Sequence, residues 1–120
     1  MKRKILIVDD EIDYLKLFQE FLTLRGYEVY CEAEPKRAVE RFRQVRPDIV
    51  FLDWDMPHIN GGELFQILQV SSPGQQVIFI SVHPVERLQQ DRYTRGAADY
   101  INKAEGLEQI TTCLSKHLER

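Results

Sequence analysis

The chain has 120 residues, a length that normally forms one domain, here expected over residues 1–120. Hydrophobic residues at 43% and charged residues at 29% exclude the disordered, collagen-like and membrane-spanning classes. The net charge of -3, without a long basic stripe, indicates that the chain does not bind nucleic acid directly.

The first predicted element is a strand over residues 5–8, and its flanks decide between a strand and a signal peptide. Basic residues precede this apolar run, but the run stops at Asp9 and Asp10. A secretory signal needs a longer apolar core, so we predict a buried strand. Without a signal, Cys31 and Cys113 are too few for a disulfide framework, and we expect reduced thiols in a cytoplasmic protein.

Further along the chain, short apolar runs alternate with stretches of helical spacing. Residues 49–52 and 77–80 are predicted as buried strands, and residues 27–31 and 99–101 as weaker ones. Four helices are predicted from apolar residues at helical spacing, which are Leu15, Phe18 and Leu22; Ala38, Phe42 and Val45; Leu64 and Leu68; and Leu107, Ile110, Leu114 and Leu118. Pro35 opens the second of these helices.

The remaining helix, over residues 84–95, has the thinnest apolar face. Val85 and Leu88 are its main apolar residues, so we expect it to be loosely held. Strict alternation of strands and helices predicts an α/β protein with a doubly wound (βα)5 sheet and helices on both faces. Ligands of such sheets bind beyond the carboxyl ends of the strands.

Chemically active side chains follow the carboxyl ends of four of the predicted strands. They are Asp9, Asp10 and Glu11 after the first strand, Asp53 and Asp55 after the third, Ser81 after the fourth, and Lys103 after the fifth. Carboxylates in one pocket repel one another unless a cation lies between them, and oxygen ligands favour magnesium over zinc. A carboxylate nucleophile, a metal, a lysine and a hydroxyl are the groups that phosphoryl transfer to an aspartate requires.

Each of these residues has a plainer interpretation when it is taken alone. An aspartate before an apolar helix is usually a cap, and aspartates before Pro57 usually form a turn. A single lysine or serine at such a place is usually an ordinary surface or strand-end residue. The prediction of a site therefore depends on all of them falling at carboxyl ends of strands at once.

Several segments of the chain match one known family as a set. They are ILIVDDE at 5–11, DIVFLD at 48–53, MP at 56–57 with Gly61, IS at 80–81 and GAADYINK at 96–103. In these segments the sequence resembles the receiver domains of two-component response regulators over essentially its whole length. The resemblance implies the flavodoxin-like form of the fold, a five-stranded parallel sheet in the order 2-1-3-4-5. It also implies a signalling switch that catalyses only its own phosphorylation and dephosphorylation.

The resemblance assigns the acidic residues to phosphorylation and metal binding. Asp53 corresponds to the phosphoacceptor, the catalytic aspartate of the family. Asp9 and Asp10 correspond to the acidic pair that binds the cofactor Mg²⁺, together with Asp53 and the main-chain carbonyl of Asp55.

The resemblance also assigns the switch residues and the partners. Lys103 corresponds to the lysine that contacts the phosphoryl group, Ser81 to the catalytic and switch hydroxyl, and Tyr100 to the switch aromatic residue. The implied donor is a phosphohistidine on a sensor histidine kinase or a histidine phosphotransfer protein. A downstream effector or fused output domain would read the surface of the fourth helix, fifth strand and fifth helix. Phosphorylation-dependent homodimers are a further implied partner, whereas nucleic acid and membrane are not.

Three residues depart from the pattern of the family. Ala104 stands where proline is usual, Val82 where a small residue is common, and Asp55 adds a carboxylate beside the acceptor. A cis bond to a residue other than proline costs about 3 kcal/mol, so we predict a trans bond before Ala104. We expect Val82 and Asp55 to slow phosphorylation by small donors.

Two other functions are compatible with parts of the sequence. A haloacid dehalogenase-like phosphatase would use Asp53 as nucleophile and Asp55 as general acid, but its motif belongs on the first strand and the chain is short for that family. A flavodoxin-like binder shares the topology, but the acidic run 9–11 would repel a phosphate.

The remaining candidates have plainer interpretations. Neither His58 nor His83 has a cysteine or second histidine at metal-ligand spacing, so both are predicted at the surface or the rim of the site. Trp54 is predicted as a partly buried neighbour of the site, and Cys113 as a packing residue of the last helix.

Overall fold

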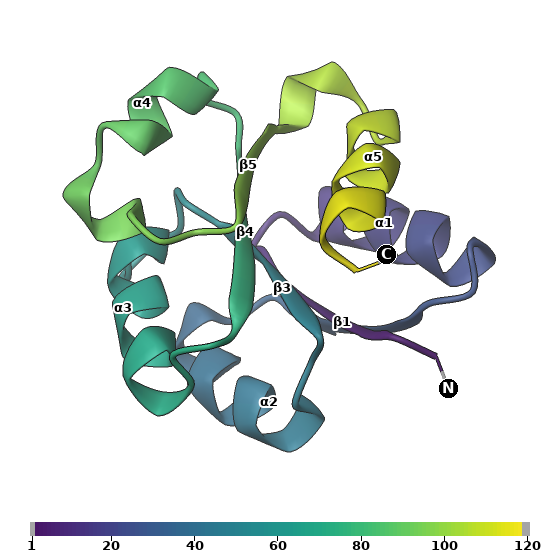
Figure 1. Cartoon of the computed structure of the whole chain (residues 1–120), viewed down its shortest axis with the longest axis horizontal. Helices are drawn as coiled ribbons and strands as arrows, with labels where there is room; N and C mark the ends of the chain where they lie inside the picture. Colours follow the sequence, from purple (N-terminus) through teal and green to yellow (C-terminus); the bar gives the residue numbers. More distant parts are fainter. Residues whose placement is uncertain (1, 119–120) are drawn as a thin grey trace.

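The structure is a computed structural model that describes residues 2–118, and a five-stranded parallel sheet forms its centre (Figure 1). The strand order β2-β1-β3-β4-β5 confirms the predicted order. The strands are β1 Lys4–Val8, β2 Glu28–Glu32, β3 Ile49–Asp53, β4 Gln76–Ser81 and β5 Asp99–Asn102. The helices are α1 Ile12–Leu24, α2 Ala38–Val45, α3 Gly61–Ser71, α4 Val85–Gln89 and α5 Glu108–His117, and the 3-10 turns are η1 Pro35–Arg37, η2 Arg92–Thr94 and η3 Lys103–Glu105.

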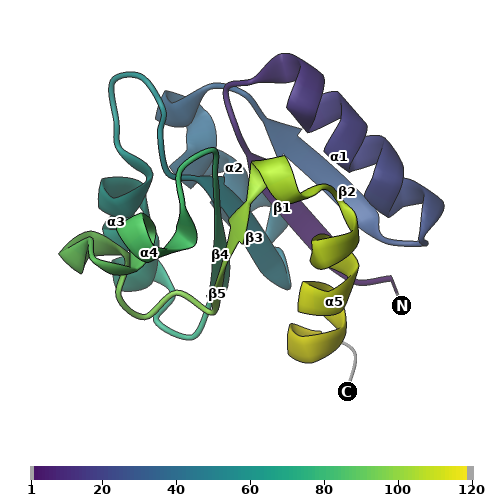
Figure 2. The same ribbon diagram turned by 90° about the horizontal axis from the view of Figure 1, so that it is seen from above.

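The three central strands are apolar along their length because helices cover both of their faces. Almost every residue of β1, β3 and β4 is buried, whereas the edge strand β2 is only half-buried throughout. Two separate hydrophobic clusters result, one on each face. Figures 1 and 2 show α1 and α5 on one face of the sheet and α2, α3 and α4 on the other.

The segment predicted as a fourth helix is shorter than expected. The α4 helix has five residues, and its buried residue is Leu88. The chain then turns, because the Asp91 carboxylate accepts a hydrogen bond from the Tyr93 N–H at 2.9 Å and so starts η2. Thr94 is buried, and its hydroxyl donates to the Leu88 carbonyl at 2.6 Å. Residues 84–95 thus form two short turns anchored by Leu88 and Thr94.

The register of the central strands decides where the polar residues meet. Val8 pairs with Leu52, so Asp9 and Asp53 leave the sheet at the same edge. Ser81, the last residue of β4, reaches this edge beside them.

In residues 2–118, none of the helices combines the length and the apolar composition that a membrane span requires.

Candidate functional site

Three aspartates meet at the carboxyl ends of β1 and β3. Asp9 is 0% exposed and Asp53 is 4% exposed, whereas Asp10 faces solvent. Each of the three offers a carboxylate oxygen, and these oxygens all lie within 4.8 Å of one another. The structure therefore brings together the acidic side chains that the sequence predicted as one cluster.

Lys103 supplies the positive charge inside this cluster. Its Nζ atom lies 2.7 Å from Asp9 Oδ2, 2.9 Å from Glu11 Oε1 and 3.5 Å from Asp53 Oδ2. The side chain is 7% exposed, and its ammonium lies 4.6 Å from the centroid of the Tyr14 ring. Burial alone would lower the pKa of Lys103, but the contacts with Asp9, Asp53 and Glu11 outweigh burial and raise it, so the ammonium stays charged.

The negative charge of the cluster exceeds what Lys103 neutralises. Burial and the neighbouring Asp9 raise the pKa of Asp53 to about 8, although Lys103 and the Asp55 N–H, which donates to Oδ1 at 3.2 Å, oppose the rise. Asp9 Oδ2 is the one buried side-chain atom of the described residues without a hydrogen bond of standard geometry, although the Lys103 ammonium lies 2.7 Å from it. Buried carboxylates with this excess charge favour a bound cation, and an all-oxygen donor set suits Mg²⁺.

The Asp55 side chain belongs to a network that joins the loops after β3 and β4. Its Oδ2 atom lies 3.2 Å from His83 Nε2, and Arg87 lies 3.3 Å from the other ring nitrogen of His83. Trp54 packs edge-on against His83 and donates from Nε1 to Asp91 Oδ2 at 2.8 Å. His83 thus lies at the rim of the site, and Trp54 is partly buried, as predicted.

Ser81 and Tyr100 face different neighbours. Ser81 is fully buried, and its Oγ accepts a hydrogen bond from the His83 N–H at 3.0 Å. The Tyr100 ring stacks on Phe79, and its hydroxyl donates to the Thr94 carbonyl at 2.9 Å. Tyr100 is thus tied to Thr94, at the end of η2, rather than to the acidic cluster.

A pocket of about 300 Å³ opens beside the acidic cluster and Lys103, at the carboxyl edge of the sheet. Its lining residues are Asp10, Glu11, Asp53, Asp55, Val82 and Lys103. Val82 is 61% exposed and lies at the rim of this pocket.

Gly61, the first residue of α3, lies so close to the end of β3 that a Cβ atom there would be 2.3 Å from the Asp53 carbonyl oxygen. The glycine lets α3 start directly behind Asp53.

The loop after Lys103 has the predicted trans geometry. No peptide bond within the described part of the chain is cis, so the prediction for Ala104 is confirmed. The Ala104 N–H donates to the Asn102 side-chain oxygen at 2.9 Å and caps η3. A proline at this position has no N–H to make that bond.

Two contacts of the site were not predicted from the sequence, one of Glu11 with Lys103 and one of His83 with Asp55. Glu11 was noted only as part of the acidic run, yet its carboxylate is a direct partner of Lys103. Its position directly after Asp9 and Asp10 was the signal that could have indicated this role. The pairing of His83 with Asp55 had no comparable signal, because it depends on how two loops meet.

The fold and the site together define a class: small doubly wound α/β proteins with an acidic pocket and a buried lysine at the carboxyl edge of the sheet. The sequence profile of the response regulator receiver domain family matches residues 5–115. The chain therefore belongs to the response regulator receiver domains, the signalling switches of two-component phosphorelays.

Named relatives agree with this assignment. The chain is 31% identical over 117 residues to the chemotaxis protein CheY of Thermotoga maritima, covering 97% of this chain and 98% of that protein. The response regulator TrrA of Thermotoga maritima, solved in complex with Mg²⁺ and BeF, has a TM-score of 0.88 and 26% identity, covering 97% of this chain and 99% of TrrA. A complex of TrrA with the histidine kinase ThkA matches with a TM-score of 0.87 at 27% identity, covering 97% of this chain and 98% of the matched chain.

Proposed function

We propose that Asp53 accepts a phosphoryl group from a phosphohistidine on a partner histidine kinase or phosphotransfer protein, with Mg²⁺ as cofactor. One observation carries the proposal: three aspartates with converging oxygens have a buried lysine ammonium among them, 3.5 Å from Asp53 Oδ2. The ThkA complex of TrrA supports a kinase as the partner.

In the proposed transfer, the Asp53 carboxylate attacks phosphorus, and the bond from phosphorus to the imidazole nitrogen of the donor breaks. The electron pair of that bond stays on the donor nitrogen. The Asp55 N–H holds Asp53 Oδ1 and so fixes the orientation of the carboxylate. The Lys103 ammonium faces the charge that arrives on the phosphoryl oxygens.

The carboxylates of the acidic cluster would hold the metal ion. Asp9, Asp10 and Asp53 would provide carboxylate oxygens, and Asp55 its main-chain carbonyl. When bound, Mg²⁺ neutralises negative charge on the transferred phosphoryl group. The Mg²⁺ and BeF complex of TrrA supports Mg²⁺ as the cofactor.

The proposed switch runs through Ser81 and Tyr100. Ser81 Oγ accepts a hydrogen bond from the His83 N–H, and its O–H can donate to an oxygen of a phosphoryl group on Asp53, so turning the hydroxyl toward that group would change the contact with His83. Tyr100 is tied to Thr94 at the end of the segment 84–95, which is held by few buried residues. A change at Ser81 can therefore reach the surface formed by α4, β5 and α5, where an effector would bind.

The test is phosphorylation with acetyl phosphate or a phosphorylated kinase in the presence of Mg²⁺. Intact-mass spectrometry should show one added phosphoryl group, and chelation of Mg²⁺ should prevent it. Asp53→Asn should abolish labelling, while the matched change Asp55→Asn should keep it, because only the side chain of Asp55 changes. Labelling that persisted in Asp53→Asn would identify another acceptor and overturn the proposal.

A further inference from the structure

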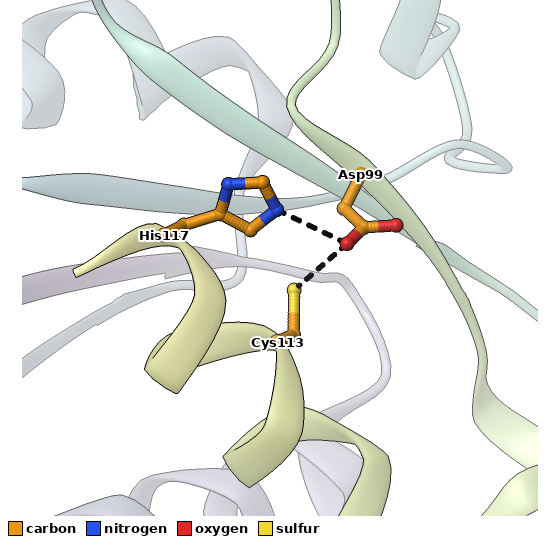
Figure 3. Close-up of side chains that lie close together, drawn as sticks. All are labelled: Asp99, Cys113 and His117. Atoms are coloured by element: carbon orange, nitrogen blue, oxygen red, sulfur yellow. Dashed lines mark hydrogen bonds and ion pairs between the residues drawn. The ribbon is translucent and has the colours of Figure 1, made fainter. Parts of the chain in front are cut away.

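A second cluster of metal-binding side chains lies between β5 and α5, apart from the acidic pocket. Asp99 of β5 and Cys113 and His117 of α5 bring an oxygen, a sulfur and a nitrogen within 4.8 Å of one another. Figure 3 shows the thiol and the imidazole both pointing toward the Asp99 carboxylate. We propose that these three residues bind a zinc ion.

The distances in the cluster are close to the edges of a zinc coordination tetrahedron. His117 Nε2 lies 3.1 Å and Cys113 Sγ lies 3.5 Å from the same atom, Asp99 Oδ2. Zinc bonds of about 2.0 Å to nitrogen and oxygen and about 2.3 Å to sulfur give edges of about 3.3 Å for N···O and about 3.5 Å for S···O. These two edges match a zinc tetrahedron, and the third, between Cys113 Sγ and His117 Nε2, is no longer than 4.8 Å, so an ion can enter if the thiol and the imidazole close around it.

The chain holds the three ligands from rigid elements. Cys113 and His117 are four residues apart on α5, so they lie on the same face of the helix. The Tyr100 N–H donates to Asp99 Oδ1 at 2.9 Å, which fixes the carboxylate and leaves Oδ2 facing the helix. An outer hydrogen bond of this kind orients a ligand for its metal.

The chemistry of the donors favours zinc over magnesium. Thiolate and imidazole are ligands of zinc, whereas Mg²⁺ prefers oxygen. Binding replaces the thiol proton of Cys113, which leaves to water, and requires the proton of His117 Nε2 to move to Nδ1 or to water so that Nε2 has a free lone pair. The thiolate and the Asp99 carboxylate together balance the charge of the ion. The Asp99 side chain is 31% exposed, so a water molecule can complete the tetrahedron from that side.

Lys116 is the competing cation of this cluster. Its Nζ atom lies 4.0 Å from Asp99 Oδ2, and its side chain is 69% exposed. The ammonium can turn into solvent when an ion enters, but its positive charge opposes binding. Lys116→Gln should therefore tighten binding by about fivefold.

Cobalt(II) is a suitable probe, because it takes tetrahedral zinc sites and its bond to a thiolate absorbs in the near ultraviolet. The full chain, with its thiols reduced, is titrated with Co²⁺ in excess Mg²⁺ so that the acidic pocket is saturated. We expect one equivalent of Co²⁺, a thiolate absorption band, and displacement of the cobalt by Zn²⁺.

Variants then assign the band to the cluster. Cys113→Ser should remove it, and Asp99→Asn and His117→Gln should each weaken binding by at least about tenfold. Cys31→Ser and His58→Gln are matched controls that change the other cysteine and an exposed histidine, and both should bind Co²⁺ as the parent does. An absent band, or a band that depends on Cys31, would overturn the proposal.

A measurement on the unaltered chain covers the case in which Cys113→Ser does not fold. In excess Mg²⁺, added Zn²⁺ should raise the melting temperature of the parent and of Cys31→Ser, because the ion binds only the folded cluster. An unchanged melting temperature in both proteins would also overturn the proposal. Phosphorylation of Asp53 takes no part in either measurement.

Discussion

The Asp55 carboxylate lies 3.2 Å from the imidazole of His83 and is 67% exposed. The additional carboxylate beside Asp53 is thus tied to the loop after β4, and the dipole or charge of the imidazole faces it. We therefore expect Asp55 to oppose an incoming phosphoryl group less strongly than a carboxylate without such a partner would.

Replacing this carboxylate should still speed phosphorylation. Asp55→Asn removes one negative charge from the pocket and keeps the main-chain carbonyl, so labelling by acetyl phosphate should be about two to three times faster. Time courses of intact mass at saturating Mg²⁺ measure the rate. Glu63→Gln, an exposed charge change on α3, is the control. An equal or lower rate in Asp55→Asn would contradict the electrostatic argument.

Shortening the side chain at the rim should widen access to Asp53. Val82 lines the pocket, so we expect Val82→Ala to speed labelling by acetyl phosphate about threefold, a difference of less than about 1 kcal/mol in the barrier. Val70→Ala truncates a valine that is 86% exposed on α3 and should leave the rate unchanged. If both variants react like the parent, steric restriction by Val82 is wrong.

Removing the Asp53 carboxylate should stabilise the protein in the absence of Mg²⁺. Because the pKa of Asp53 rises from 3.8 to about 8 on folding, the folded chain keeps a proton that the unfolded chain has lost between these pH values. The unfolding free energy of the parent should therefore fall as the pH rises through this window. Asp53→Asn should remove most of that fall and be more stable than the parent by several kcal/mol at its upper end, since each pKa unit corresponds to about 1.36 kcal/mol.

Urea denaturation in a chelating buffer across this pH window measures the effect of Asp53→Asn. Glu20→Gln, which changes an exposed carboxylate of α1, should follow the pH profile of the parent. Saturating Mg²⁺ should reduce the difference, since the cation stabilises the ionised cluster. A variant less stable than the parent at the alkaline end would show that burial does not destabilise the Asp53 charge.

The close approach of α3 to the strand end should make Gly61 intolerant of a side chain. A Cβ atom would lie 2.3 Å from the Asp53 carbonyl oxygen and 2.7 Å from the Trp54 Cα atom, both in the main chain. Gly61→Ala should lower the unfolding free energy by about 3 kcal/mol and slow phosphorylation, because the strand end or the helix must move. Gly74→Ala, where a Cβ atom meets nothing within 4 Å, is the matched control. Equal stability of the two variants would contradict the clash.

The sheet could be predicted from the sequence because its central strands are covered on both faces. Runs such as 5–8 and 49–52 are uniformly apolar for this reason, and each predicted strand ends within one residue of the observed one. The segment 84–95 was predicted as one helix, because Asp91, although a residue type that caps helix starts, also occurs within helices and did not by itself divide the segment. Two hydrogen bonds divide it in the folded chain, one from the Tyr93 N–H to the Asp91 carboxylate and one from the Thr94 hydroxyl to the Leu88 carbonyl.

The acidic site could be predicted in outline, because parallel strands place their carboxyl ends at one edge. The proximity of Asp9, Asp53 and Lys103 followed from this rule. The pairing of Lys103 with Glu11 spans 92 residues of sequence and depends on side-chain conformations that no pattern encodes. The cluster of Asp99, Cys113 and His117 between β5 and α5 was likewise missed. The spacing of Cys113 and His117 is visible in the sequence, but Asp99 joins them only through the packing of α5.

The cap between Asn102 and Ala104 makes these two positions dependent on each other. Proline at 104 would leave the Asn102 side-chain oxygen without its donor, and a residue without a side-chain acceptor at 102 would leave the Ala104 N–H unpaired. Substitutions at the two positions should therefore be strongly non-additive. A change at 104 to proline, the residue common in the family, would loosen the turn that carries Lys103. In this chain such a change therefore requires a compensating change at residue 102.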